Sequence, residues 1–289
     1  MPVIVNTTES ITFLFGQLNC WINFYLLFSI FYKKKIPLKP DLSLIYCRFG
    51  TDMIYTFFVS LSMLFYLMHQ IFPSFPIKNL IFFIIWPALI MGTIRANLVF
   101  LITFDRFLAA YLPVFHHNYR SRIPILIIFL ILLIYAIFEH FVLFGFCDFV
   151  LDVPITCDTL ICAINTCYYS YWLWYEQVMY VLIGIFTISL GLRLFVWNRY
   201  MDTSSNHTIT RATRIALLDS IIICTFDVIP SLLLAHFPAL SFPIVGPLSA
   251  VSKNTGFLIE GIIICIVLLG KKKTGIVQAW STSRISRSN

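Results

Sequence analysis

The sequence predicts an all-α membrane protein folded as a bundle of seven transmembrane helices. Of its 289 residues, 60% are hydrophobic and only 11% are charged, whereas soluble domains carry about 25% charged residues. Seven stretches are long and apolar enough to cross a bilayer, which takes about 20 residues of helix. Lysine and arginine are concentrated in alternate connections between those stretches. This composition excludes a soluble enzyme, a disordered chain and a nucleic-acid-binding domain, despite the net charge of +7.

The first three predicted spans differ in their charge. Span 12–32 has no charged residue, and we expect it to be retained because it lacks the basic start and cleavage site of a signal peptide. Span 42–69 contains Arg48 and Asp52, and span 80–104 contains Arg95. Ionisable groups within a bilayer are costly unless they are paired, so these residues are candidates for function.

The remaining four spans all carry ionisable residues. They are 123–146 with Glu139, 172–196 with Glu176 and Arg193, 216–236 with Asp219 and Asp227, and 242–269 with Lys253 and Glu260. The sequence shows no internal repeat, which argues against a transporter built from two related halves. We therefore expect one domain over residues 1–270, followed by a basic tail over 271–289.

The distribution of basic residues predicts the orientation of the bundle. Cytoplasmic loops of membrane proteins are enriched in lysine and arginine. The predicted opposite side has Lys78 as its one basic loop residue. The basic side comprises Lys33, Lys34, Lys35, Lys39, Arg106, Arg120, Arg122, Arg199, Arg211, Arg214, Lys271, Lys272, Lys273, Arg284 and Arg287. We therefore expect the N-terminus outside the cell and the C-terminal tail in the cytosol.

The segment between spans 4 and 5, on the predicted outer side, holds four cysteines. They are Cys147, Cys157, Cys162 and Cys167. An oxidising compartment favours one or two disulfides there, and three pairings are open. Asn6 begins an outward-facing glycosylation sequon close to the membrane.

The sequence contains no recognisable catalytic or cofactor motif. It has no HExxH, no nucleotide-binding glycine loop and no nucleophile elbow, and its six histidines are scattered. We therefore expect neither an enzyme nor a bound cofactor or metal. A further alternative is an integral-membrane lipid enzyme. Turnover of a lipid headgroup by the purified protein would support it.

The end of the third span carries the most specific motif. It reads DRFLAAYLPV over residues 105–114. This resembles the D-R-Y-x-A-x-x-x-P-L stretch of rhodopsin-like G-protein-coupled receptors, with Phe107 in place of Tyr and Val114 in place of Leu. The continuation FHHNYR over residues 115–120 is similar to the nematode serpentine chemoreceptors, most closely class BC.

This resemblance implies a chemosensory receptor in the plasma membrane, in the cilium of a sensory neuron. Its partners would be a small molecule of the odorant or pheromone class, the lipid bilayer and a heterotrimeric G protein. Asp105 and Arg106 would form the coupling switch, in which the carboxylate holds or releases the guanidinium. The chain departs from the rhodopsin-like pattern because span 7 has no N-P-x-x-Y, Val228 replaces a Trp two residues before Pro230, and no Cys opens span 3.

Three buried charges are predicted at the same depth. Asp52 lies ten residues after position 42, Arg95 ten before position 105 and Glu260 ten before position 270, which is about 15 Å from the inner face at 1.5 Å per residue. In rhodopsin-like receptors the first two positions line a sodium pocket. We expect the Arg95 guanidinium to replace the ion and to bridge the two carboxylates, either as a switch or as a static brace.

A second ion pair, between Asp227 and Lys253, is expected nearer the outside. Pro230 lies three residues after Asp227 and would let span 6 bend. The ligand site is expected between the helices in the outer half, lined by aromatic side chains. The candidates are Trp86, residues 168–175, Glu176 and Tyr180, although an interfacial aromatic belt is the better reading for most of Trp172, Trp174 and Tyr175. The alternative function is a small transporter or channel, in which Asp52, Arg95 and Glu260 would line the conduction path.

Overall fold

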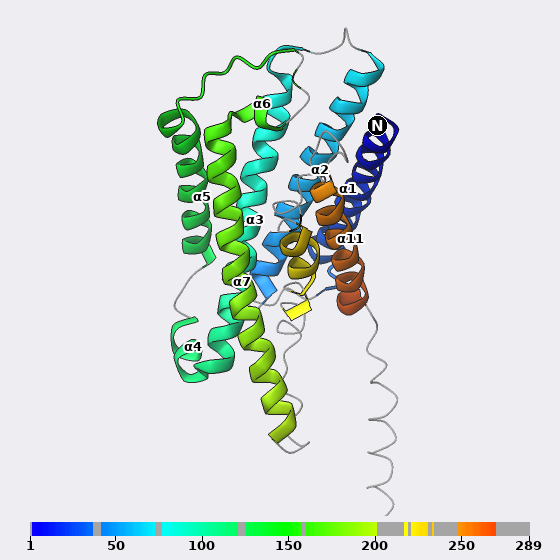
Figure 1. Cartoon of the computed structure of the whole chain (residues 1–289). Helices are drawn as coiled ribbons and strands as arrows, with labels where there is room; N and C mark the ends of the chain where they lie inside the picture. The colour runs from blue at the N-terminus through cyan, green and yellow to red at the C-terminus, as the bar shows by residue number, and fades with distance from the viewer. Residues whose placement is uncertain are drawn as a thin grey trace, which may run out of the picture.

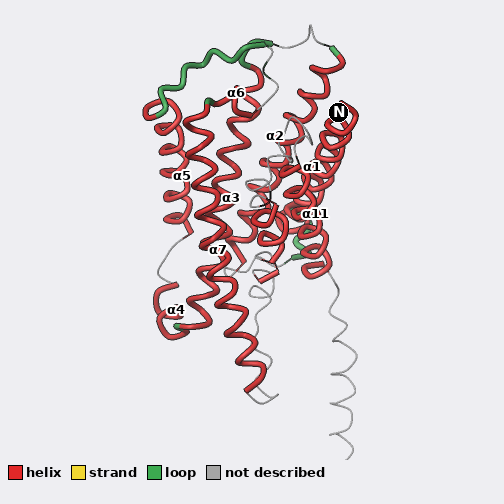
Figure 2. Tube along the Cα trace, viewed as in Figure 1, coloured by secondary structure: helices red, strands yellow, loops and turns green. Residues whose placement is uncertain are grey.

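The computed structural model describes residues 2–36, 42–72, 77–120, 125–155, 157, 160–200, 217–218, 221–230, 233 and 248–269. Within these residues every regular element is helical, and the long helices lie side by side in one bundle (Figure 1). Figure 2 shows the same trace, with most of the described loop at the end of the bundle near α6.

The bundle is built from six long helices. They are α1 (Pro2–Phe31), α2 (Ser43–Ile71), α3 (Leu80–Tyr111), α5 (Ile125–Phe141), α7 (Thr166–Tyr200) and α11 (Leu248–Leu269). The short elements are α4 (Pro113–Arg120), α6 (Leu160–Ile164) and two π-helical turns, η2 (Val142–Phe146) and η4 (Cys224–Val228).

Six of the seven predicted spans have a helix that is long and apolar enough to cross a membrane. The predicted sixth span, 216–236, is described at 217–218, 221–230 and 233, where it is helical. Residues 242–247 of the seventh span and the predicted tail, 271–289, lie outside the described residues.

The helices are longer than the apolar stretches that predicted them. α3 continues to Tyr111 instead of ending at 104, because residues 105–112 contain no proline or glycine. Pro113 then disfavours helical geometry at the residue before it. α1 begins at Pro2, where proline is tolerated because the first helical N–H has no partner within the helix. The Asp105–Arg106 dipeptide therefore lies inside a helix and not at its end.

The packing places α3 at the centre of the bundle. α3 contacts α2 and α7, and α1 contacts α2 and α11. The flanks expose large apolar side chains such as Trp21, Ile134 and Ile188, which suits a surface that faces lipid. We call the end with α6 the disulfide end and the opposite end, with α4, the α4 end (Figure 1).

Candidate functional site

Four charged residues from three helices form an ionic network inside the bundle. Arg95 Nε on α3 lies 2.8 Å from Asp52 Oδ1 on α2, and Arg95 Nη2 lies 3.5 Å from Glu260 Oε2 on α11. Arg48 Nε lies 3.3 Å from Asp52 Oδ2, and Arg48 Nη2 contacts Glu260 Oε1. None of the four residues is more than 4% exposed. The structure thus brings together the three charges that were expected to meet and adds a fourth.

Arg48 is the member that the sequence reasoning missed. It lies one helical turn from Asp52 on α2 and is 1% exposed. The signal was the four-residue spacing, because residues i and i+4 lie on the same face of a helix. With Arg48 included, two guanidinium groups face two carboxylates, so the network is neutral as a whole. Burial of ion pairs is tolerated when charges are matched and hydrogen bonded in this way.

An aromatic side chain supports Arg95 from α11. The Arg95 guanidinium carbon lies 3.8 Å from the centroid of the Phe257 ring, a cation–π contact. The Tyr55 ring of α2 packs edge-on against the same Phe257 ring, with centroids 5.8 Å apart. The aromatic contacts and the ion pairs therefore tie α2, α3 and α11 together at one level.

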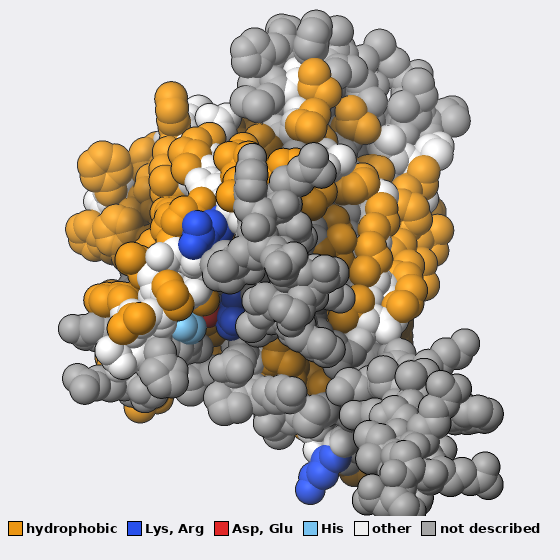
Figure 3. Space-filling view, turned by 90° about the horizontal axis from the view of Figure 1, so that it is seen from below, with side chains coloured by type: hydrophobic (Ala, Val, Ile, Leu, Met, Phe, Trp, Pro, Cys, Tyr) orange, Lys and Arg blue, Asp and Glu red, His pale blue; other side chains and the backbone are white. Residues whose placement is uncertain are grey.

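The Asp105–Arg106 pair has a third member at the α4 end. Arg106 Nη2 lies 3.0 Å from Asp105 Oδ2, and His116 Nε2 from α4 lies 3.1 Å from Asp105 Oδ1. His116 belongs to the FHHNYR stretch over residues 115–120, but the sequence does not indicate this contact. Figure 3 views the molecule from this end, where lysine, arginine and histidine side chains are set among hydrophobic ones. Asp105 thus joins α3 to the short helix that follows it.

The expected Asp227–Lys253 ion pair is not formed. Lys253 Nζ lies 2.5 Å from Glu176 Oε1 on α7. The Tyr180 hydroxyl donates to the same carboxylate oxygen at 3.0 Å. Asp227 lies in η4 and is 1% exposed, and its Oδ1 has no hydrogen-bond partner among the described residues. The expected pair is absent because Lys253 Nζ lies at contact distance from Glu176 on α7 instead. The predicted hinge residue, Pro230, follows η4 in a helical segment.

Several aromatics expected near a ligand are engaged by a buried carboxylate. The Tyr168 hydroxyl donates to Glu139 Oε2, and the Tyr171 hydroxyl donates to Glu139 Oε1 at 3.2 Å. Trp86 Nε1 donates to His140 Nε2 at 3.1 Å. Glu139 is fully buried. These side chains brace α3, α5 and α7 against one another beneath the disulfide end.

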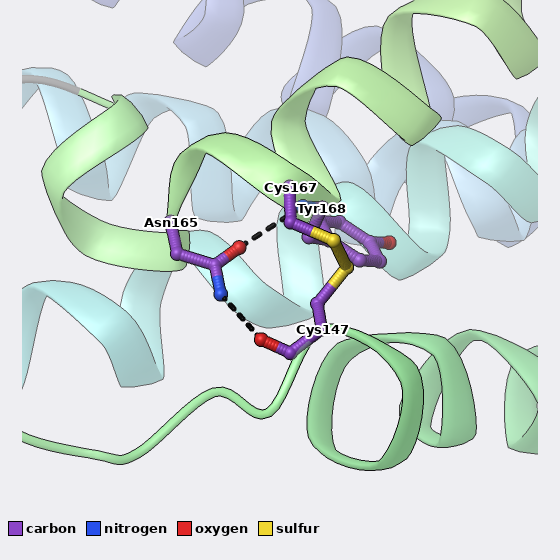
Figure 4. Close-up of a disulfide and its surroundings, with 4 residues drawn as sticks. All are labelled: Cys147, Asn165, Cys167 and Tyr168. Atoms are coloured by element: carbon purple, nitrogen blue, oxygen red, sulfur yellow. Dashed lines mark hydrogen bonds between the residues drawn. A yellow bond between two sulfur atoms is a disulfide. The ribbon is translucent and has the colours of Figure 1, made fainter.

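Two disulfides close the disulfide end. Cys147 is bonded to Cys167, and Cys157 is bonded to Cys162, which is one of the three pairings left open by the sequence. Asn165 supports the first bond, because its Nδ2 donates to Cys147 O at 3.0 Å and its Oδ1 accepts from Tyr168 N at 2.9 Å (Figure 4). This disulfide fastens the end of η2 to the start of α7.

The structure also bears on the glycosylation sequon and on metal binding. Asn6 is exposed near the start of α1, and its glycosylation stays a prediction. Among the described residues, no group of three histidine, cysteine, aspartate or glutamate side chains is placed to hold a metal ion.

Comparison with known families now adds to this geometry. A family model described as serpentine type 7TM GPCR chemoreceptor Srbc matches residues 1–272. A comparison with curated proteins finds no match. The family match covers all seven predicted spans and confirms the resemblance of the motif at residues 105–120. The chain therefore belongs to the Srbc family of serpentine seven-transmembrane chemoreceptors, a family of nematode multi-pass membrane receptors and not of enzymes.

Proposed function

We propose that this protein binds an extracellular small molecule of the odorant or pheromone class and activates a cytosolic heterotrimeric G protein. The observation that carries the proposal is the Asp105–Arg106 pair on α3, held by His116 of α4. In the proposed topology the disulfide end faces outside and the α4 end faces the cytosol, with residues 1–270 as the seven-span domain and 271–289 as the tail. Family membership supports a plasma-membrane location, in the cilium of a sensory neuron.

The proposed coupling switch works by exchange of partners at Asp105. One carboxylate oxygen contacts Arg106 and the other contacts His116. Charge-assisted contacts of this kind hold the guanidinium of Arg106 in place. Release of Asp105 would free Arg106 to contact a protein docking at the α4 end. The receptor would thus shift between two populations. In one, Asp105 holds Arg106, and in the other Arg106 is released.

A route from the disulfide end to the ionic network runs along α11. Lys253, Phe257 and Glu260 follow one another at spacings of four and three residues, so they lie on one face of the helix. Lys253 contacts Glu176, Phe257 underlies Arg95, and Glu260 belongs to the ionic network. A ligand that disturbs the Glu176–Lys253 pair would therefore move a helix that carries part of the network. In this proposal the network is a switch element and not only a brace.

Nucleotide exchange on a purified G protein tests the proposal without knowledge of the ligand. The full chain is reconstituted in lipid nanodiscs, and GTP binding to added G protein is measured. Asp105→Asn should raise basal exchange because it weakens the hold on Arg106, and the added substitution Arg106→Ala should abolish the increase. Asp152→Asn is the matched control, because Asp152 pairs with Lys78 on the exposed surface of the disulfide end. Equal exchange for all four proteins, at the level of G protein alone, would contradict G-protein coupling.

The transporter or channel alternative receives less support from the network. A conduction path needs groups that water or substrate can reach. Arg48, Asp52, Arg95 and Glu260 are almost fully buried and neutralise one another. Uptake or current in liposomes that contain only this protein would favour the alternative over the receptor.

A further inference from the structure

Asp227 is a buried carboxylate whose charge is not matched by any ion pair in the described part of the chain. It is 1% exposed, and its Oδ1 has no hydrogen-bond partner there. The other buried carboxylates among the described residues, Glu9, Asp52, Glu139 and Glu260, each contact a donor. A buried ionised carboxylate is strongly unfavourable unless a cation or donor compensates it. Among the described residues, Asp227 is therefore the buried carboxylate that lacks a compensating cation or donor.

The two cations that attract Asp227 most strongly already form ion pairs with other carboxylates. Lys253 and Arg95 both attract Asp227, but Lys253 Nζ contacts Glu176 and Arg95 contacts Asp52. Neither approaches Asp227 within ion-pair distance. In this part of the described bundle, three cations thus face four carboxylates, which are Asp52, Glu176, Asp227 and Glu260.

The aromatic side chains around the Glu176–Lys253 pair are suited to a cation. Lys253 Nζ lies 5.5 Å from the centroid of the Trp172 ring and 5.6 Å from that of the Tyr180 ring. Aromatic faces attract ammonium groups, and more strongly when water is excluded. Tyr180 also belongs to a buried apolar cluster against which Val228, the residue after Asp227, is packed. The Lys253 ammonium group therefore shows that these aromatic rings can surround a cation.

Close packing holds Asp227 in position. Ser252 Oγ on α11 donates to the Phe226 carbonyl oxygen at 2.8 Å. A Cβ atom at Gly256 would lie 2.7 Å from Phe226 Cβ, so only glycine permits this approach of α11 to η4. π-helical turns inside α-helices are frequent at functional sites. Asp227 lies in such a turn, next to a helix that also carries Lys253.

We propose that Asp227 binds the protonated amine of a small organic ligand, whose apolar part lies against the aromatic side chains near Lys253. This inference rests on the proposed receptor function and specifies the ligand as a cation. An ammonium group would supply the missing charge and donate charge-assisted hydrogen bonds to the carboxylate. An anionic ligand suits the site less well, because Lys253 already has a carboxylate partner and a further negative charge would face Asp227.

Thermal unfolding of the full chain in lipid nanodiscs tests the ligand class. The probes are phenylethylammonium, propylammonium, 2-phenylethanol and phenylacetate, compared at constant ionic strength. The two ammonium ions should raise the unfolding midpoint in a concentration-dependent way, since they bind the folded state. The alcohol and the carboxylate should not. Asp227→Asn should lower the apparent affinity for the amines by about tenfold or more, whereas Asp148→Asn, at an exposed position of the disulfide end, should leave it unchanged.

The unfolding midpoint without ligand reports on Asp227 independently of the amine chosen. Asp227→Asn alone should raise the unfolding midpoint, because the amide keeps the shape and removes an unmatched buried charge. A lowered midpoint would mean that Asp227 has a partner within the chain. Stabilisation by phenylacetate and not by the amines would make Lys253 the anchor of an anion. An unchanged midpoint together with no response to either amine would also overturn the inference.

These measurements contain no G protein, so they separate this inference from the proposed function. A receptor that shows Arg106-dependent nucleotide exchange but no amine response would overturn only the ligand class. An amine-stabilised protein without nucleotide exchange would contradict only the coupling.

Discussion

Arg48 and Arg95 lie on different helices and contact the same two carboxylates. Arg48 reaches Asp52 and Glu260 from α2, and Arg95 reaches the same pair from α3. Each carboxylate thereby faces two guanidinium groups, and each guanidinium faces two carboxylates. The four side chains behave as one unit, so the effects of substitutions within it should not be additive.

Arg95→Ala should strongly destabilise the protein. Removal of one partner leaves buried carboxylates undercompensated, at a cost of about 3–5 kcal/mol. The measurements are the yield of monodisperse receptor and its unfolding midpoint in lipid. Adding Glu260→Gln should restore much of the loss, because one positive and one negative charge then remain. Full yield of Arg95→Ala with both carboxylates intact would contradict the network.

The partner of Lys253 can be determined by charge exchange. Glu176→Lys and Lys253→Glu should each lower the unfolding midpoint, and the double substitution should recover most of the loss because the pair is restored in reverse. The matched control is Asp227→Lys combined with Lys253→Asp, which should show no such recovery. Recovery in the control alone would support the pair expected from the sequence instead.

His116→Ala should raise basal nucleotide exchange. His116 Nε2 contacts Asp105 Oδ1, and its removal would loosen the carboxylate that holds Arg106. Asn118→Ala, at an exposed position of α4, is the control and should have no effect. His116→Gln should behave more like the unsubstituted protein than His116→Ala does, since an amide can still donate to the carboxylate. Equal nucleotide exchange in all variants would mean that His116 contributes to packing and not to the coupling switch.

The two disulfides should differ in their contribution to stability. The Cys147–Cys167 bond closes a loop with a sequence separation of 20, whereas Cys157–Cys162 has a separation of 5. Longer loops lose more entropy on closure, and a bond of the first kind typically contributes about 2–4 kcal/mol. Cys147→Ser with Cys167→Ser should therefore lower the unfolding midpoint more than Cys157→Ser with Cys162→Ser. The reverse order would show that chain entropy does not govern this segment.

The sequence by itself determined much of the architecture. Apolar length located the spans for which the structure describes a membrane-length helix, and the motif at residues 105–120 indicated the receptor family. The common depth of Asp52, Arg95 and Glu260 followed from helical rise alone, because rise depends on residue count and not on packing. The concentration of four cysteines in one segment likewise pointed to disulfides there.

The tertiary structure decided which side chains meet. Three contacts depend on how each helix is rotated about its axis: Arg48 joins the network, Glu176 pairs with Lys253, and His116 contacts Asp105. The cysteine pairing depends on the path of the loop, because Cys147 and Cys157 lie outside the helices. Sequence periodicity reveals that rotation when one face meets water and the other a core. In a bilayer both faces are apolar, so the pattern is nearly uniform around each helix. Only the packed bundle then selects one partner from several candidates at similar depth.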